Sequence, residues 1–168
     1  ITVVDDPDIG FHIETILPRY SSISRRDPAE QEKEQVLVSN VDFVGITCSV
    51  DRPPNIAKIE RFLILAQDSD AVPLLLLTKV DQGISEGWNQ LQQKIRDVIT
   101  IQTSSVTGTG INEVRELLSL DKTLVLLGES GVGKSTLVNE LVGEAVQQTT
   151  EVRSRDNKAR HTTIAREL

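Results

Sequence analysis

The chain has 168 residues and a net charge of −7 at neutral pH, with 38% hydrophobic and 26% charged residues. This composition indicates a soluble globular protein of one domain, or of one domain plus a fragment, and the acidic balance argues against a surface that is basic throughout and binds nucleic acid over its whole area. The single cysteine excludes an intrachain disulfide and a zinc site with several cysteine ligands. No apolar run approaches the ~18 residues of a transmembrane helix, so we expect a cytoplasmic protein with no part in a membrane.

Residues 1–26 predict a β-hairpin. Two short extended runs flank a turn at Asp5–Gly10, where aspartates, a proline and a glycine favour chain reversal. Residues 27–35 are polar and show no apolar period, so we expect a linker there.

Residues 36–168 have the pattern of an α/β domain. Apolar runs predict buried strands, and apolar residues at helical spacing predict helices between them. The expected strands cover residues 41–50, 72–78, 99–105 and 123–127, and the expected helices cover 56–66, 88–98, 111–118 and 134 to about 142. Because strands alternate with helices, we expect a mostly parallel sheet. The long polar stretch after Gly143 indicates a functional loop.

The strongest motif is GESGVGKS at residues 128–135, which fits the pattern G-x-x-x-x-G-K-[ST] between an expected strand and an expected helix. Its glycines would let backbone N–H groups form an anion-binding nest at a helix N-terminus. Lys134 would be the catalytic cation that bridges the β- and γ-phosphates, and the Ser135 hydroxyl would coordinate Mg²⁺. A glycine-rich turn without a ligand is the alternative. The residues predicted to surround the phosphates are Gly128, Glu129, Ser130, Gly131, Val132, Gly133, Lys134, Ser135 and Thr136.

A second motif, TKVD, ends another expected strand and comprises Thr78, Lys79, Val80 and Asp81. Ligands of open α/β sheets lie at the carboxyl ends of the strands. The carboxylate of Asp81 would accept hydrogen bonds from guanine N1–H and from the 2-amino group, for which adenine has no matching pair of donors. The stem of Lys79 would lie along the base. By itself the motif is weak, because Lys and Asp in a turn more often form only a solvated surface.

Two further segments are candidates for the same site. Residues 103–110 follow an expected strand, and backbone N–H groups around Ser104 and Ser105 would hold guanine O6, although an ordinary loop explains the same residues. The segment ARHTT contains Thr162 and Thr163, one of which would contact Mg²⁺ and the γ-phosphate as a switch loop does. A polar connecting loop is the alternative there.

These motifs resemble those of a guanine-nucleotide-binding domain in an unusual order. Thr78–Asp81 and Ser104-Ser105 precede the phosphate loop, whereas the phosphate loop ordinarily comes first. The order resembles that of a circularly permuted GTPase. Within that group, the chain is similar to the ribosome small-subunit-dependent GTPase A (RsgA) family. The similarity rests on ILPRYSSISRR at residues 16–26, on the loop GxSGVGKST, and on ARHTT with REL soon after it.

The resemblance implies a circularly permuted α/β P-loop GTPase domain with a mostly parallel sheet over residues 36–168, incomplete at its C-terminus. The last hairpin of an OB-like β domain would precede it over residues 1–26. The resemblance also implies GTP or GDP with Mg²⁺ as ligands, and GTP hydrolysis stimulated by the small ribosomal subunit during late maturation of that subunit. The partners would be the subunit and its rRNA, the protein would be a monomer, and zinc would belong only to a C-terminal domain absent from this chain.

The chain departs from the family pattern at three points. Thr78 stands where asparagine is usual, so we expect a weaker contact to guanine N7, and Ser105 stands where alanine is usual. No D-x-x-G motif lies between Thr163 and Leu168, so the chain alone lacks residues that would hold Mg²⁺ through water and could be inactive.

Two rival functions stay open at this point. One is a P-loop ATPase or kinase in which TKVD is coincidental, and the other is a non-catalytic scaffold that binds the ribosome. Contact with RNA, if the protein makes any, would concentrate on the local basic runs, which comprise Arg19, Arg25, Arg26, Arg153, Arg155, Lys158 and Arg160.

Overall fold

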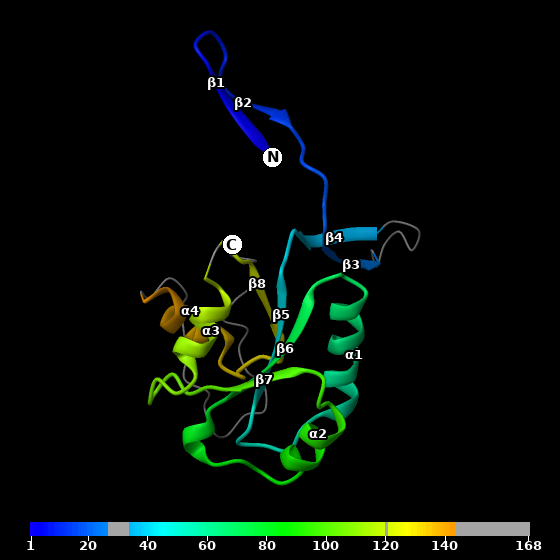
Figure 1. Cartoon of the computed structure of the whole chain (residues 1–168), viewed down its shortest axis with the longest axis vertical. Helices are drawn as coiled ribbons and strands as arrows, with labels where there is room; N and C mark the ends of the chain where they lie inside the picture. Colours follow the sequence, from blue (N-terminus) through cyan, green and yellow to red (C-terminus); the bar gives the residue numbers. More distant parts are fainter. Residues whose placement is uncertain (27–33, 120, 144–168) are drawn as a thin grey trace.

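The computed structural model describes residues 1–26, 34–119 and 121–143 (Figure 1). Its central feature is a four-stranded parallel sheet with the strand order β7-β6-β5-β8. These strands are β5 (Phe43–Ser49), β6 (Val72–Thr78), β7 (Ile99–Gln102) and β8 (Leu124–Gly128). The parallel α/β sheet that the alternation of apolar runs and helices predicts is therefore confirmed.

The parallel register brings the carboxyl ends of three strands to one edge of the sheet. Ser49 at the end of β5 lies opposite Thr78 of β6, and Thr47 lies opposite Gly128 of β8. Gly45 makes room inside the sheet, since a Cβ there would lie 2.7 Å from a side-chain atom of Leu126 and 2.8 Å from one of Leu76. The sequence motifs that follow β6 and β8 consequently start from the same edge.

Helices cover both faces of this sheet (Figure 1). They are α1 (Ile56–Gln67), α2 (Trp88–Lys94), α3 (Ile111–Leu117) and α4 (Lys134–Val142). The leucines of β6 alternate between the faces, as the period of two in a strand requires. Leu75 and Leu77 join the core of α1 and α2, which includes Ile59, Leu63, Trp88 and Leu91. Leu74 and Leu76 join the core of α3 and α4, which includes Ile111, Val114 and Leu137.

The N-terminal hairpin is confirmed as a pair of antiparallel strands, β1 (Thr2–Asp6) and β2 (Gly10–Thr15). It extends away from the α/β body in Figure 1. Its assignment to an OB-like domain stays a prediction.

The segment after the hairpin differs from the expectation for residues 16–35. Two further antiparallel strands lie there, β3 (Ser22–Arg26) and β4 (Glu34–Ser39), so residues 34 and 35 of the expected linker belong to a strand. Residues 27–33 lie outside the described part of the chain. The sequence did not reveal β3 because only Ile23 in it is strongly apolar. That side chain is 2% exposed and packs in a cluster with Val44 and Ala66 of the α/β body.

Two elements end three or more residues earlier than predicted. The helix expected over residues 88–98 ends at Lys94, because Ile95 leaves the helical conformation with φ −111° and ψ 41°. Ile95 and Val98 nevertheless pack against the core of α1 and α2 from a turn, which explains their helix-like spacing. The strand expected over residues 99–105 ends at Gln102. No helix in the described ranges has both the length and the apolar character needed to cross a bilayer.

Candidate nucleotide-binding site

The phosphate loop joins the end of β8 to the start of α4, as the sequence predicts. Gly128 must be glycine, because a Cβ there would lie 2.4 Å from the carbonyl oxygen of Thr47. Gly131 and Gly133 have φ values of +77° and +99°, a region that residues with a side chain rarely adopt. The loop therefore turns sharply and delivers the chain to the N-terminus of α4, where backbone N–H groups without intrahelical partners favour an anion.

Lys134, the first residue of α4, folds back over this loop. Its Nζ donates to the carbonyl oxygens of Gly128 at 3.0 Å and Glu129 at 2.7 Å. Burial lowers the pKa of Lys134, the nearby Lys58 cation acts in the same direction, and the Glu129 carboxylate opposes both. The Lys134 ammonium is thus held across the mouth of the loop by two carbonyl oxygens, and phosphate oxygens can take their place as acceptors.

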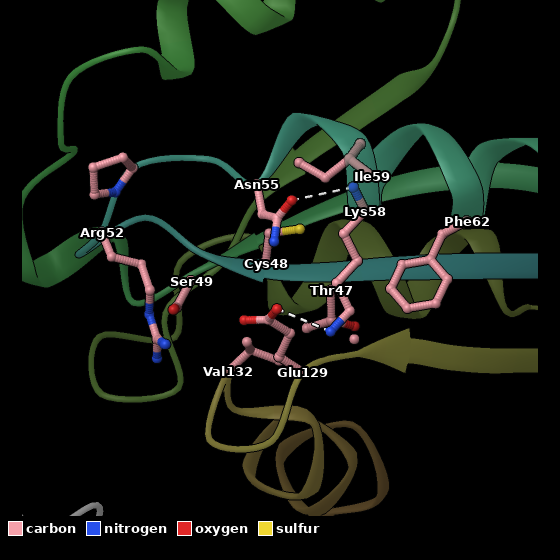
Figure 2. A pocket seen from close by; sticks show the side chains of 12 residues that line it. Thr47, Cys48, Ser49, Arg52, Asn55, Lys58, Ile59, Phe62, Glu129 and Val132 are labelled. Atoms are coloured by element: carbon pink, nitrogen blue, oxygen red, sulfur yellow. Dashed lines mark hydrogen bonds and ion pairs between the residues drawn. The ribbon is translucent and has the colours of Figure 1, made fainter. Parts of the chain in front are cut away.

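Glu129 is the second residue of the loop and carries an ion pair to α1. Lys58 Nζ lies 2.9 Å from Glu129 Oε1, and Figure 2 shows the two side chains pointing toward one another. The hydrogen bond from Lys58 lowers the pKa of Glu129, although burial opposes the shift. Sequence reasoning missed Lys58, because nothing in the local pattern of α1 connects it with a residue 71 positions later.

The Lys58–Glu129 pair borders an open pocket of about 360 Å³ between the end of β5, the first turn of α1 and the phosphate loop (Figure 2). Asn55 begins α1 here, since its Oδ1 accepts from the backbone N–H of Lys58 at 3.2 Å. Cys48 lines the same pocket, and burial raises the pKa of its thiol to about 12. The thiol is therefore protonated at neutral pH.

Thr78 connects the TKVD segment to the phosphate loop. Its hydroxyl donates to the carbonyl oxygen of Val132 at 2.5 Å and lies 3.3 Å from that of Cys48. Thr78 and Val132 are both buried. Because a hydroxyl has only one hydrogen, Thr78 donates it to the phosphate loop at Val132 and not to Cys48.

The remaining TKVD residues leave the strand in a tight turn. Lys79 has φ +61°, and η1 (Val80–Gln82) follows it as a single 3₁₀ turn. The Nζ of Lys79 lies 3.5 Å from Asp51 Oδ2, a carboxylate beyond the end of β5 that sequence reasoning also missed. Burial opposes the ionised form of Asp51, but the nearby Ser49 hydroxyl and the Lys79 and Arg52 cations leave its pKa lowered. Val80 packs against the core of α1 and α2.

Asp81 is held by the third predicted segment. Ser104 Oγ donates to Asp81 Oδ1 at 2.5 Å and accepts from the backbone N–H groups of Val106 and Thr107 at 3.2 Å. Ser104 is buried, whereas Asp81 is exposed. The turn after Ser104 depends on Gly110, where φ is +67° and a Cβ would lie 2.0 Å from the carbonyl oxygen of Gln102. Two motifs that the sequence presents separately are thus joined by a direct hydrogen bond.

The described residues of the site come together at the carboxyl edge of the sheet. Ser130 lies in the loop, and Ser135 and Thr136 lie in the first turn of α4. Thr162 and Thr163, predicted to contact the metal, lie outside the described residues. In the described ranges, no group of three or more His, Cys, Asp or Glu side chains could hold a metal ion. The Ser135 hydroxyl is the described group whose chemistry and position suit Mg²⁺ beside a phosphate.

A parallel α/β sheet whose glycine-rich loop leads into a lysine at a helix N-terminus defines a P-loop nucleotide-binding protein, here with the predicted base-recognition segments placed before the phosphate loop. A family model described as RsgA GTPase matches residues 16–168, and the chain belongs to this family.

Individual relatives agree with this assignment. The chain is 36% identical over 173 residues to the small ribosomal subunit biogenesis GTPase RsgA of Methanosarcina acetivorans, a match that covers 100% of this chain and 46% of the relative. It is 37% identical over 168 residues to RsgA 2 of Lactiplantibacillus plantarum, covering 96% and 46%. The crystal structure of YjeQ from Thermotoga maritima matches with a TM-score of 0.67 and 27% identity, over 88% of this chain and 51% of that one. The chain thus spans about half the length of these relatives.

Proposed function

We propose that this chain is the nucleotide-binding part of a GTPase that binds GTP with Mg²⁺ and hydrolyses it to GDP and phosphate. The observation that carries the proposal is the pair of hydrogen bonds from Thr78 to Val132 and from Ser104 to Asp81. The first joins the TKVD segment to the phosphate loop, and the second joins it to the loop after β7. Three separate segments thereby form one site with a phosphate end and a base end.

At the phosphate end, backbone N–H groups of residues 128–136 surround the phosphates, and Lys134 moves from its two loop carbonyls to the β- and γ-phosphate oxygens. The hydroxyl of Ser135 would hold the magnesium ion, with Thr162 or Thr163 as a second ligand. Mg²⁺, when bound, neutralises charge on the phosphate oxygens. Lys134 and the loop N–H groups stabilise the charge that spreads over the transferred phosphoryl group.

At the base end, the carboxylate of Asp81 accepts from guanine N1–H and the 2-amino group, while Lys79 packs along the ring. Ser104 orients the carboxylate, because its hydroxyl donates to one carboxylate oxygen and is itself fixed by two backbone N–H groups. The backbone N–H of Ser105 donates to guanine O6. Adenine lacks the matching donors, so the arrangement favours GTP over ATP.

The partner follows from the relatives, which are named small ribosomal subunit biogenesis GTPases. We propose that this protein also acts in small-subunit biogenesis, in the cytoplasm and as a monomer, and that the subunit and its rRNA stimulate hydrolysis. The local basic runs around Arg19 and over residues 153–160 are the proposed RNA contacts. A zinc site would belong to a domain outside this chain.

The test is nucleotide binding and turnover by the full-length protein. We expect tight binding of GTP and GDP, weak binding of ATP, and GTP hydrolysis that rises when small subunits are added but not when large subunits are added. Equal affinity for ATP and GTP would instead support a P-loop ATPase or kinase. Ribosome binding by a protein with no affinity for nucleotide would support the scaffold.

A further inference from the structure

Two lysines from different helices converge on Glu129. Lys134, at the start of α4, donates to its backbone carbonyl oxygen at 2.7 Å, and Lys58, in the first turn of α1, donates to its side-chain Oε1 at 2.9 Å. Glu129 therefore contacts Lys134 through its backbone and Lys58 through its carboxylate. That carboxylate points toward Lys58 of α1 (Figure 2).

A carboxylate at this place would repel the phosphates of a nucleotide bound in the loop. A nucleoside triphosphate brings several negative charges, and like charges repel strongly when they lie within the ~8 Å screening length of physiological salt. The hydrogen bond from Lys58 lowers the pKa of Glu129, so the carboxylate is ionised at neutral pH. The Glu129 side chain is 38% exposed, so its charge is only partly removed from the solvent that fills the site.

Lys58 is the cation that bonds the Glu129 carboxylate directly, whereas Arg52 and Lys134 act on its pKa only through their charge. Arg52 lies 3.6 Å from Asp51, and Lys79 lies 3.5 Å from the same residue. Lys58 reaches Glu129 because Asn55 starts α1 at the carboxyl edge of the sheet and thus places Lys58 in the first helical turn. The position of α1 thus brings the Lys58 ammonium to Glu129.

We propose that Lys58 is a positioning residue of the phosphate site, whose ammonium neutralises Glu129 and holds the start of the phosphate loop against α1 so that a triphosphate can bind beside a carboxylate. The inference rests on the proposed function, since it concerns the binding of the same GTP. It predicts a greater effect on GTP than on GDP, because the γ-phosphate adds negative charge. It also predicts little effect on folding, since ion pairs that are this exposed contribute little to stability.

The experiment measures affinity for GDP and for a non-hydrolysable GTP analogue in four variants of the full-length protein. Lys58→Met removes the ammonium, Glu129→Gln removes the carboxylate, and a double variant removes both. Lys122→Met is the matched control, because Lys122 pairs with Asp42 at 2.8 Å but lies before β8, at the opposite end of that strand from the loop. Thermal melting of each variant reports on folding.

We expect Lys58→Met to weaken binding of the GTP analogue about tenfold and binding of GDP less. The loss of affinity should become smaller at high salt, because salt screens the charges. Lys122→Met should bind both nucleotides as the wild type does. Glu129→Gln should bind the analogue more tightly than the wild type, and the double variant should recover to within about twofold of it, since no unpaired carboxylate is left.

Either of two results would overturn the inference. In the first, Lys58→Met binds the analogue as tightly as Lys122→Met does. In the second, the double variant is as weak as Lys58→Met, which would mean that Lys58 acts by packing and not by neutralising Glu129. A wild-type protein that binds neither nucleotide would overturn the proposed function itself, and the inference with it.

Discussion

The hydroxyl of Thr78 donates to the carbonyl oxygen of Val132 at 2.5 Å, across 54 residues of sequence. The bond joins the last residue of β6 to the middle of the phosphate loop, and both partners are buried. The TKVD segment and the phosphate loop are therefore parts of one hydrogen-bonded unit.

Thr78→Val is expected to weaken both stability and nucleotide binding. Valine keeps the shape of threonine but leaves the carbonyl of Val132 buried without this donor, which costs about 1–3 kcal/mol. Denaturant unfolding and GTP affinity would be measured together. Thr78→Ser, which keeps the hydroxyl, is the control and should retain most of both. Equal behaviour of the valine and serine variants would show that the bond does not fix the loop.

Lys134→Ala is expected to abolish GTP hydrolysis and reduce GTP affinity while the protein stays folded. The side chain donates to two carbonyl oxygens of the phosphate loop, and within the described part of the chain it belongs to none of the core clusters. Loss of one preorganised donor to a developing charge costs roughly 10²–10³ in turnover. Lys94→Ala, on the exposed side of α2, is the charge-matched control. Normal GTP hydrolysis by Lys134→Ala would contradict the assignment of residues 128–135 as the phosphate loop.

Asp81→Asn is expected to shift base preference from guanine toward xanthine. The oxygen of the asparagine amide can still accept from Ser104, which turns the amide N–H₂ toward the base. The 2-amino group of guanine would then face the amide N–H₂, so that two donors meet. Xanthine has a carbonyl at position 2, which can accept from the amide. An unpaired buried donor costs about 1–3 kcal/mol, so GTP affinity should fall roughly 5- to 150-fold.

Competition among GTP, XTP and ATP on both versions of the full-length protein provides the measurement. Retention of the wild-type preference for GTP by Asp81→Asn would mean that TKVD is a surface turn. The P-loop ATPase would then become the better functional proposal.

Acid is expected to destabilise the protein through Glu129 and Asp51. The pKa of each is lowered in the folded state from ordinary values of 4.5 and 3.8. A carboxyl whose folded pKa lies below its unfolded pKa contributes stability that is complete above the unfolded value and is lost as pH falls through the folded value. The free energy of unfolding should therefore decrease once the pH falls below about 4.5.

Denaturant unfolding of the wild type and of Glu129→Gln, between about pH 7 and about pH 3, measures this contribution. The glutamine variant should show a slightly smaller decrease in stability on acidification, because it has one titrating group fewer and the partly exposed Lys58–Glu129 ion pair contributes only a little stability. An identical decrease in both proteins would mean that the ion pair with Lys58 does not stabilise the fold.

The sequence alone determined the class of fold and the chemistry of the loop. Continuous apolar runs such as residues 72–78 can only be strands buried on both faces, and helical periods between them impose parallel connections. The phosphate loop is equally local, because Gly128, Gly131 and Gly133 meet backbone requirements that no other residue meets at low cost. These features depend only on a few neighbouring residues, so they can be predicted from the sequence.

Only the tertiary structure decided which side chains meet. It assigned the Thr78 hydroxyl to the phosphate loop, Ser104 to Asp81 and Lys58 to Glu129, in pairs that lie 54, 23 and 71 residues apart. It also paired the polar segment β3 with β4 and buried Ile23 of β3 against the α/β body, which no local apolar period indicates. Such contacts follow from strand order and register, which place the ends of β5, β6 and β8 at one edge. A linear pattern carries no signal for a partner that is brought close only when the sheet assembles.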